Sequence, residues 1–296
     1  MKIGIAGTGK MGAAIAGRLL SVGHAVMVWN RTAEKTKALA AAGANVAATP
    51  AQLATQCEVV VTILTDAAAI DATYHGKNGL LAGEVRGKLF IDMSTVRPQT
   101  AKALAEKVRA KQAVFVECPV GGTVGPAREG KLLGLAGGDA ADAARAQPIL
   151  AQLCRRIEHA GPVGAGASMK LAINLPLFVF WRAFAEALQL CRHLGRDPAW
   201  LIDLFADTSG GPNVLKVRGP ALAAVLAGKD PGPPTFDIDL VRKDLQTMME
   251  EGKALGVDLP LVARTRECYD AAARDGWGSR DVATVLSYWL DGGKLH

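Results

Sequence analysis

The chain has few aromatic residues, few cysteines and no block of like charge. Aromatic residues are 5%, charged residues 21% and hydrophobic residues 50% of the 296 residues, a balance that excludes an intrinsically disordered chain. The five cysteines include no Cys-x-x-Cys pair, which fits reduced thiols and no metal site. The net charge of +6 is dispersed, which gives no support for nucleic-acid binding and fits an anionic small-molecule ligand.

Long hydrophobic runs are missing as well. The most apolar stretch, 171–181, is about half of the ~20 residues that a membrane-spanning helix needs, and it contains Asn174 and Pro176. We expect a buried helix there and no membrane association. The chain opens with MKIGI, which reads as a strand and lacks the charged and apolar regions of a signal peptide, so we expect a cytoplasmic protein.

Short apolar runs alternate with helical patterns in the first half of the chain. This alternation predicts an α/β domain with a parallel sheet covered on both faces by helices. The expected strands lie at 2–7, 25–29, 58–64, 88–92, 113–117, 132–136 and 155–158, and the expected helices at 10–21, 32–42, 50–56, 97–110 and 139–152.

A segment that breaks regular structure, GPVGAG at 161–166, marks the expected domain boundary. Beyond it the sequence shows only helical patterns, beginning with one long helix. We therefore predict an α/β domain of residues 1–163 and an all-α domain of residues 164–296, joined by that helix. The helical patterns of the second half lie at 167–194, 198–207, 214–227, 238–255, 260–274 and 280–290.

A glycine motif, GTGKMG at 7–12, follows the first predicted strand and opens the first predicted helix, the context in which G-x-G-x-x-G binds a dinucleotide. Gly7 permits the tight turn, Gly9 lets a pyrophosphate approach the backbone, and Gly12 lets the helix pack closely on the strand. A glycine-rich turn without a ligand is the alternative. The motif predicts a Rossmann-type domain, with Lys10 and Met11 also in the cofactor site.

The end of the second strand bears on which cofactor is bound. A carboxylate at this point would bind the 2′-hydroxyl of NAD, but the chain has Asn30-Arg31-Thr32 followed by Lys35. A guanidinium suits a 2′-phosphate, so we favour NADP (NADPH) over NAD and assign these four residues to the cofactor site. The alternative is that Arg31 only forms a surface ion pair, for instance with Glu34.

Lys170 and Asn174 lie four residues apart, on one face of the long predicted helix. Lys170 has apolar neighbours, and burial there disfavours the charged ammonium and prepares the group to exchange a proton. The alternative is a lysine whose stem follows the helix while its ammonium reaches water. We take these two residues as the catalytic candidates.

Together, separated segments resemble the β-hydroxyacid dehydrogenase family, and within it the glyoxylate and succinic semialdehyde reductase branch. The resemblance covers essentially the whole chain. The segments are IAGTGKMGAAIAGRL (5–19) with WNRT (29–32), FIDMSTVRPQT (90–100), ECPVGGTVGPAREGKL (117–132), and GAGASMKLAINL (164–175) with FDIDLVRKD (236–244).

The resemblance implies roles for individual residues. Lys170 takes the place of the family's proton donor, and Asn174 that of the nearby amide, one residue later than in most members but as in the branch named above. The other implied cofactor contacts are Thr95 at the nicotinamide, Leu64 and Thr65 at the ribose, and Lys243, which reaches over cofactor and substrate from the helical domain. The implied substrate contacts include Ser94, Lys170 and Phe236.

The substrate loop departs from the family pattern. The family binds the substrate carboxylate with a Pro-Val-Ser-Gly loop, whereas this chain has glycine, Gly121, in place of the serine. Backbone N–H groups of Gly121 and Gly122 and the Thr123 hydroxyl are the remaining candidate substrate contacts. The alternative is a turn whose glycines serve only its backbone conformation.

The resemblance implies hydride transfer from a nicotinamide to a carbonyl carbon, with Lys170 as proton donor and no metal. We expect NADPH-dependent reduction of a small carboxylate-bearing aldehyde, such as succinic semialdehyde or glyoxylate. The alternatives are a 3-hydroxyisobutyrate-type dehydrogenase, an imine reductase and a non-catalytic dinucleotide-binding module. The apolar long helix suggests a homodimer or homotetramer formed through the helical domain.

Overall fold

The computed structural model describes residues 1–293 and divides the chain into two compact units, one of residues 1–171 and one from residue 172 onward. We call them the α/β unit and the helical unit. The division falls inside helix α8 (Ala165–Cys191), after Leu171, whereas the sequence predicted a boundary after residue 163. The difference arises because the first turns of α8 pack with the α/β unit although they belong to the long helix.

The α/β unit is built on one sheet with the strand order β3-β2-β1-β4-β5-β6-β8-β7, and β9 pairs with β8. The pairs from β3 to β6 are parallel, as predicted, but β8 is antiparallel to β6 and β7. The strands are β1 (Lys2–Ala6), β2 (Ala25–Trp29), β3 (Asn45–Val46), β4 (Val59–Thr62), β5 (Leu89–Asp92), β6 (Val114–Glu117), β7 (Val120–Gly121), β8 (Leu132–Gly137) and β9 (Cys154–Gly161).

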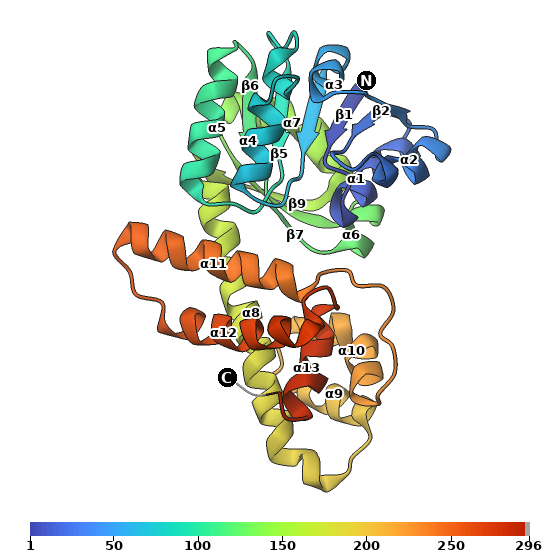
Figure 1. The fold of residues 1–296 in the computed structure, drawn as a ribbon, viewed down its shortest axis with the longest axis vertical. Helices are drawn as coiled ribbons and strands as arrows, with labels where there is room; N and C mark the ends of the chain where they lie inside the picture. Colours follow the sequence, from blue (N-terminus) through green and yellow to red (C-terminus); the bar gives the residue numbers. More distant parts are fainter. Residues whose placement is uncertain (294–296) are drawn as a thin grey trace. The chain divides into compact units, whose positions relative to one another are not determined.

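Helices cover both faces of this sheet, as predicted (Figure 1). Alternate strand residues face opposite sides, so Ile3 and Ile5 join one core and Ala6 the other. The first core takes side chains from α1 (Lys10–Ser21), α2 (Lys37–Ala41), α6 (Val124–Glu129) and α7 (Ala140–Leu153). The second takes them from α3 (Pro50–Gln56), α4 (Ala67–His75) and α5 (Pro98–Ala110).

Helices α4 and α6 were not predicted from the sequence. Helix α4 begins with an N-cap, because Asp66 Oδ1 accepts a hydrogen bond from the Ala69 N–H at 2.8 Å. Ile70 and Tyr74, four residues apart, form its buried face, which is too short a pattern to stand out in the sequence.

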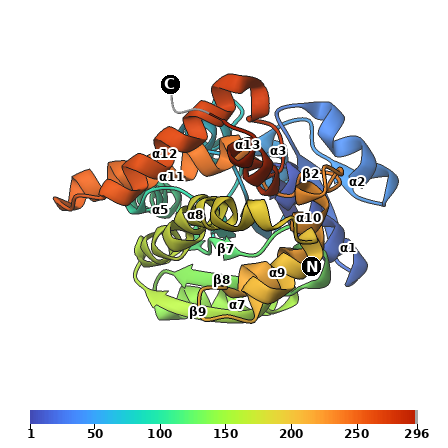
Figure 2. The same cartoon turned by 90° about the horizontal axis from the view of Figure 1, so that it is seen from below.

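The helical unit contains the rest of α8 and the helices α9 (Pro198–Ala206), α10 (Asn213–Leu226), α11 (Ile238–Leu255), α12 (Pro260–Ala272) and α13 (Val285–Leu290). In both views α9 lies beside α10 and α11 beside α12 (Figures 1 and 2). Through Gly293 the unit has no β-strand, which agrees with the predicted all-α domain. Five helical patterns that followed the long helix in the sequence correspond to these five helices.

The helical segment from Ala165 to Leu194 is longer than the apolar stretch of 171–181 in the sequence. It has 30 residues, and its most apolar window reaches a mean hydropathy of 1.4 with 39% of that window buried. By length and composition it is therefore long enough to cross a membrane. Core helices of soluble proteins pass the same test, so this is weak support for a membrane span.

Candidate active site

The glycine motif forms the turn between β1 and α1. Gly7 has φ +99°, and a Cβ there would lie 2.5 Å from the Ile63 carbonyl oxygen. A Cβ on Gly12 would lie 1.8 Å from the Gly7 carbonyl oxygen, so the helix packs on the turn too closely for any side chain. Gly9 differs, because a Cβ there meets nothing within 4 Å. This open approach at the start of α1 is where the pyrophosphate of a dinucleotide binds in such folds.

Asn30 at the end of β2 stabilises this turn. Its Oδ1 accepts a hydrogen bond from the Thr8 N–H at 2.9 Å, and its Nδ2 donates to the Thr32 carbonyl at 3.0 Å. The Thr8 hydroxyl in turn donates to the Lys35 carbonyl at 3.2 Å. The Asn30 side chain was predicted to contact the cofactor. In the structure it holds the backbone of the turn at which the cofactor is expected.

Arg31, Thr32 and Lys35 are exposed beside this turn. The alternative prediction was an ion pair between Arg31 and Glu34. In the structure Glu34 instead forms an ion pair with Lys37, at 2.6 Å. The basic side chains at the end of β2 are thus available to solvent where the 2′ position of an adenosine ribose is expected.

A buried hydrogen-bond network joins the ends of β4 and β5. Ser94 Oγ donates to Asp92 Oδ1 at 2.8 Å and accepts from the Leu64 N–H at 2.9 Å. Thr62 Oγ1 donates to the same Asp92 oxygen at 2.6 Å. Burial raises the pKa of Asp92 to about 6, opposed by the hydrogen bonds from Thr62 and Ser94. Ser94, 2% exposed, therefore fixes the Leu64 backbone, a role that the sequence analysis did not foresee.

Other predicted residues of this region differ in exposure. Thr65 is exposed, whereas Thr95 is half-buried. Both follow strand ends, at the carboxyl edge of the parallel strands where α/β folds bind ligands. The structure thus brings the predicted ribose and nicotinamide residues to one edge of the sheet.

The loop predicted to bind the substrate carboxylate runs from β7 to α6. Gly122 has φ +115°, and a Cβ there would meet Leu132 Cδ2 at 2.9 Å. At Gly121 a Cβ would make only ordinary contacts with Leu133, the nearest at 3.5 Å. Thr123 is the N-cap residue of α6 and makes no side-chain capping bond. Glycine is therefore required at 122 by conformation, while position 121 has room for the side chain found in the family.

Lys170 lies on α8 and is 8% exposed. The start of this helix is bound by Glu117, which was not among the predicted site residues. Glu117 Oε1 accepts hydrogen bonds from the N–H groups of Gly164 at 2.6 Å and Gly166 at 2.9 Å. Burial raises the pKa of Glu117 to about 7. The sequence signal was a lone acidic residue ending an otherwise apolar strand.

In the helical unit, Asn174 and Lys243 meet at a buried carboxylate, Asp244. Asn174 Nδ2 donates to Asp244 Oδ2 at 3.1 Å, and Lys243 Nζ lies 2.6 Å from Asp244 Oδ1. Asp244 is 3% exposed and was not predicted. The predicted substrate residue Phe236 stacks on Phe178 of α8, with ring centroids 5.8 Å apart. The predicted amide, lysine and aromatic residues thus come from α8, from α11 and from the segment just before α11.

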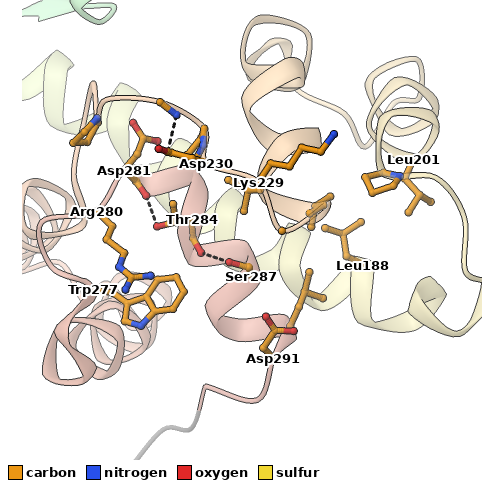
Figure 3. A pocket seen from close by; sticks show the side chains of 18 of the residues that line it. Leu188, Leu201, Lys229, Asp230, Trp277, Arg280, Asp281, Thr284, Ser287 and Asp291 are labelled. Atoms are coloured by element: carbon orange, nitrogen blue, oxygen red, sulfur yellow. Dashed lines mark hydrogen bonds between the residues drawn. The ribbon is translucent and has the colours of Figure 1, made fainter.

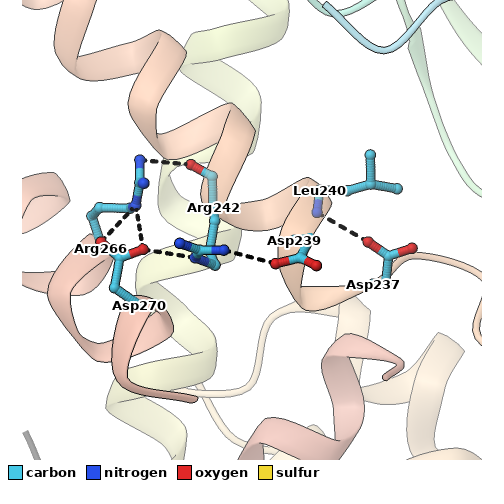
Figure 4. A network of polar contacts seen from close by, with 6 residues as sticks. All are labelled: Asp237, Asp239, Leu240, Arg242, Arg266 and Asp270. Atoms are coloured by element: carbon cyan, nitrogen blue, oxygen red, sulfur yellow. Dashed lines mark hydrogen bonds and ion pairs between the residues drawn. The ribbon is translucent and has the colours of Figure 1, made fainter. Parts of the chain in front are cut away.

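Helix α11, which carries Lys243 and Asp244, is fixed at its start and along its side (Figure 4). Asp237 caps it by accepting the Leu240 N–H at 3.0 Å. Arg242 bridges Asp239 of α11 at 2.8 Å and Asp270 of α12 at 2.6 Å. Because these side chains retain partial exposure, each pair contributes modestly, but the network fixes the register of α11 against α12.

A cavity of about 1020 Å³ lies elsewhere in the helical unit, between the end of α8, the 228–234 loop and α13 (Figure 3). It is lined by none of the predicted site residues. Arg280 lies over the Trp277 ring at 3.9 Å from its centroid, and Arg192 pairs with Asp291 at 2.9 Å. Arg192 and Asp291 thus neutralise each other, and Arg280 is held against an aromatic ring. The candidate site is the set of residues described above and does not include this cavity. Residues 1–293 contain no group of three or more His, Cys, Asp or Glu side chains able to hold a metal ion.

Comparison with known proteins supports a dinucleotide-binding α/β domain followed by a second domain of dehydrogenase type. The model of the NAD binding domain of 6-phosphogluconate dehydrogenase matches residues 2–161, and that described as NAD-binding of NADP-dependent 3-hydroxyisobutyrate dehydrogenase matches residues 164–289. The dinucleotide-binding turn lies within the first match, and both models describe parts of dehydrogenases, so this chain is an NAD(P)-dependent oxidoreductase.

Similar individual proteins show which family of oxidoreductases the chain belongs to. The chain is 33% identical over 286 residues to glyoxylate/succinic semialdehyde reductase 1 of Arabidopsis thaliana, covering 97% of each chain. It is 34% identical over 279 residues to 3-hydroxyisobutyrate dehydrogenase of Pseudomonas aeruginosa, covering 92% of each. The solved structure of Psf3 in complex with NADP+ and 2-OPP has a TM-score of 0.88 and 25% identity, covering 97% of this chain and 99% of that one. The chain belongs to the β-hydroxyacid dehydrogenase family, as its motifs indicated.

Proposed function

We propose that this protein is an NADPH-dependent reductase of a small carboxylate-bearing aldehyde, of the succinic semialdehyde or glyoxylate type. The observation that carries the proposal is Lys170: a lysine that is 8% exposed, on the helix that follows the dinucleotide-binding sheet, one turn before the buried amide of Asn174. The 33% identity to the Arabidopsis reductase over nearly the whole chain supports the substrate class.

Each residue of the candidate site has a separate role in the proposed reaction. NADPH, when bound, supplies the hydride that adds to the aldehyde carbon. Lys170 Nζ gives its proton to the aldehyde oxygen as negative charge develops there, and Asn174 on the same helix face orients the reacting groups. Backbone N–H groups of Gly121 and Gly122, with the Thr123 hydroxyl, hold the carboxylate.

The preference for NADPH rests on the end of β2. Arg31 and Lys35 are exposed there, and no carboxylate stands where NAD would need one for its ribose 2′-hydroxyl. The contacts at the ribose and nicotinamide come from Leu64, Thr65 and Thr95.

The second candidate is oxidation of a β-hydroxyacid such as 3-hydroxyisobutyrate. The 34% identity to the Pseudomonas dehydrogenase favours it, and the same lysine in its neutral form would remove the hydroxyl proton. Reduction of an imine and a purely dinucleotide-binding role rank below these two, because neither gives a role to a buried lysine and a buried amide on one helix face.

We also propose a homodimer or homotetramer formed through the helical unit, in the cytoplasm. Apolar side chains at the end of α8 and on α9 support an interface, since Leu190 is 80% exposed, Leu194 56% and Trp200 49%. Burial of this surface in an oligomer also accounts for the apolar composition of α8 without a membrane. Light scattering coupled to size-exclusion chromatography measures the assembly directly.

The proposed function is tested by binding and turnover together. NADPH and NADH are titrated by fluorescence, and the tighter cofactor is then assayed with glyoxylate, succinic semialdehyde, methylmalonate semialdehyde, a cyclic imine and, in the oxidised form, 3-hydroxyisobutyrate. We expect NADPH oxidation with one carboxylate aldehyde at the highest kcat/KM. Turnover of the cyclic imine alone, or binding without turnover of any compound, would contradict the proposal.

A further inference from the structure

The cavity of about 1020 Å³ in the helical unit has no role in the proposed reaction (Figure 3). Its volume is comparable to that of the largest small-molecule sites, about 1,000 Å³. Leu188 and Val225 form a buried part of its lining, and half-buried Leu201 and Leu290 extend this apolar surface. A ligand with an apolar body would therefore remove hydrocarbon surface from water on entering it.

Two of the acidic side chains that line the cavity are neutralised by arginines. Asp291 pairs with Arg192, which also lines the cavity, at 2.9 Å. Asp281 pairs with Arg218 of α10, which lies outside the lining. These pairs leave neither carboxylate to neutralise the other cations of the cavity.

The remaining charged side chains of the lining give an excess of positive charge. Lys229, Arg196 and Arg280 form no ion pair within residues 1–293. Arg196 and Arg280 lie instead over tryptophan rings, at 5.5 and 3.9 Å from the ring centroids. The remaining carboxylate of the lining, Asp230, accepts the Gly232 N–H at 2.9 Å. The positive excess favours a ligand that carries an anionic group.

The loop after α10, which forms one side of the cavity, is restricted in its conformation. It contains Pro231, Pro233 and Pro234, and the proline ring fixes the backbone angle φ at each of these positions. At the end of the loop the Thr235 N–H donates to Asp281 Oδ2 at 2.9 Å. The cavity wall is therefore formed before any ligand binds, so that little chain entropy is lost on binding.

At the end of the long helix, the cavity and the proposed subunit interface use different faces. Leu188 and Arg192, four residues apart, line the cavity. The exposed Leu190 and Leu194 of the proposed interface each follow two residues later, about 200° around the helix axis. An oligomer that buries Leu190 and Leu194 therefore leaves this side of the cavity open.

We propose that this cavity is a binding site for a small amphipathic anion, whose apolar body lies against Leu188, Val225 and Leu201 and whose anionic end pairs with Lys229. Lys229 is the lining cation that neither pairs with a carboxylate nor lies over an aromatic ring. The site is separate from the residues assigned to the reaction, so the proposal does not depend on the proposed function. A medium-chain carboxylate has this chemistry in its simplest form, and octanoate is therefore the probe.

Isothermal titration calorimetry on the full chain tests the ligand class. Octanoate is compared with 1-octanol and octylammonium, which keep the apolar chain and change the charge. We expect saturable binding of octanoate, at least about tenfold tighter than that of 1-octanol, the gain from one charge-assisted hydrogen bond, and no measurable binding of octylammonium. Equal affinity for octanoate and 1-octanol overturns the proposal, and so does the absence of saturable binding up to about 5 mM octanoate.

A lysine variant tests the anionic end of the site. Lys229→Gln should weaken octanoate binding about tenfold and change 1-octanol binding by less than about twofold. Lys216→Gln is the matched control, because Lys216 is exposed on α10 and does not line the cavity. It should keep the wild-type affinity. Equal losses of octanoate affinity in both variants would show only a general attraction to a basic surface and would overturn the proposal.

A cavity-filling variant locates the bound probe. Ser287 of α13 is half-buried and lines the cavity, so the ring in Ser287→Phe takes up part of its space. We expect at least about a tenfold loss of octanoate affinity with wild-type helix content by circular dichroism. Unchanged octanoate binding in this variant, or displacement of octanoate by succinate, which has no apolar chain, would place the probe elsewhere and overturn the proposal.

Light scattering of the same variant tests a second copy of the chain as the occupant. If Ser287→Phe converts an oligomer into a monomer, the cavity is a subunit contact and the proposal is wrong. If Ser287→Phe does not fold, the three probes and Lys229→Gln still decide the result.

Discussion

Ser94 offers a sharp test of the buried network at the sheet edge. The Ser94 side chain is 2% exposed. Ser94→Ala removes the hydroxyl that accepts a hydrogen bond from the Leu64 N–H at 2.9 Å and donates one to Asp92 at 2.8 Å. A buried donor left without a partner costs about 1–3 kcal/mol, and the lost bond to Asp92 adds about 1 kcal/mol. We therefore expect the free energy of unfolding to fall by about 2–4 kcal/mol at pH 8.

The loss should depend on pH. The pKa of Asp92 is raised to about 6, so its carboxyl group contributes stability below its unfolded pKa that is lost as the pH rises through 6. The Ser94 hydrogen bond favours the ionised form, so its removal raises the pKa further and destabilises the protein more at pH 8 than at pH 5.

Urea denaturation of the wild type and Ser94→Ala at pH 5 and pH 8 measures both effects. Ser21→Ala is the matched control, because the Ser21 hydroxyl also donates at 2.8 Å but is exposed. The NADPH dissociation constant should also rise severalfold, since the Leu64 backbone loses its anchor. A loss below about 0.5 kcal/mol at pH 8, equal to that of the control, would refute the assigned network.

Three further predictions concern separate parts of the molecule. Arg31→Ala should weaken NADPH binding by about 1.5–3 kcal/mol, roughly tenfold or more, and leave NADH unchanged in fluorescence titration; equal losses for both would exclude a 2′-phosphate contact. Gly121→Ser should fold normally and lower KM for a carboxylate aldehyde, whereas Gly122→Ala should lower the melting temperature because of its φ of +115°; the reverse order would contradict the loop geometry. Arg218→Leu should cost about 3 kcal/mol in chemical denaturation by leaving the buried Asp281 without its cation, and a neutral result would show that the pair is dispensable.

The sequence predicts the elements that carry strong local patterns. The glycine motif of 7–12 has its expected position between β1 and α1, because turn geometry and close packing demand glycine at particular places. The long helix and the five helices after it follow from apolar periodicity. Short elements such as α6 and β7 carry too few residues for a period to appear.

The buried carboxyl groups are harder to predict. Each of Asp92, Glu117 and Asp244 appears in the sequence as an ordinary acidic residue. Their importance comes from partners far away in the chain, which are Thr62, Gly164 and Asn174 respectively. Asn30 was predicted to contact the cofactor and Ser94 the substrate, but the sequence does not reveal that their polar atoms bind backbone groups. Hydrogen-bond partners depend on tertiary structure, which residue spacing alone does not encode.

The central claim is that Lys170 donates the proton. Its most direct test is Lys170→Met, assayed by stopped-flow NADPH oxidation with the best substrate of the panel, beside a fluorescence titration of NADPH. We predict a fall in kcat of at least ~100-fold with the NADPH dissociation constant within about twofold of the wild type. Unchanged kcat with intact cofactor binding would remove Lys170 from the mechanism and contradict the account.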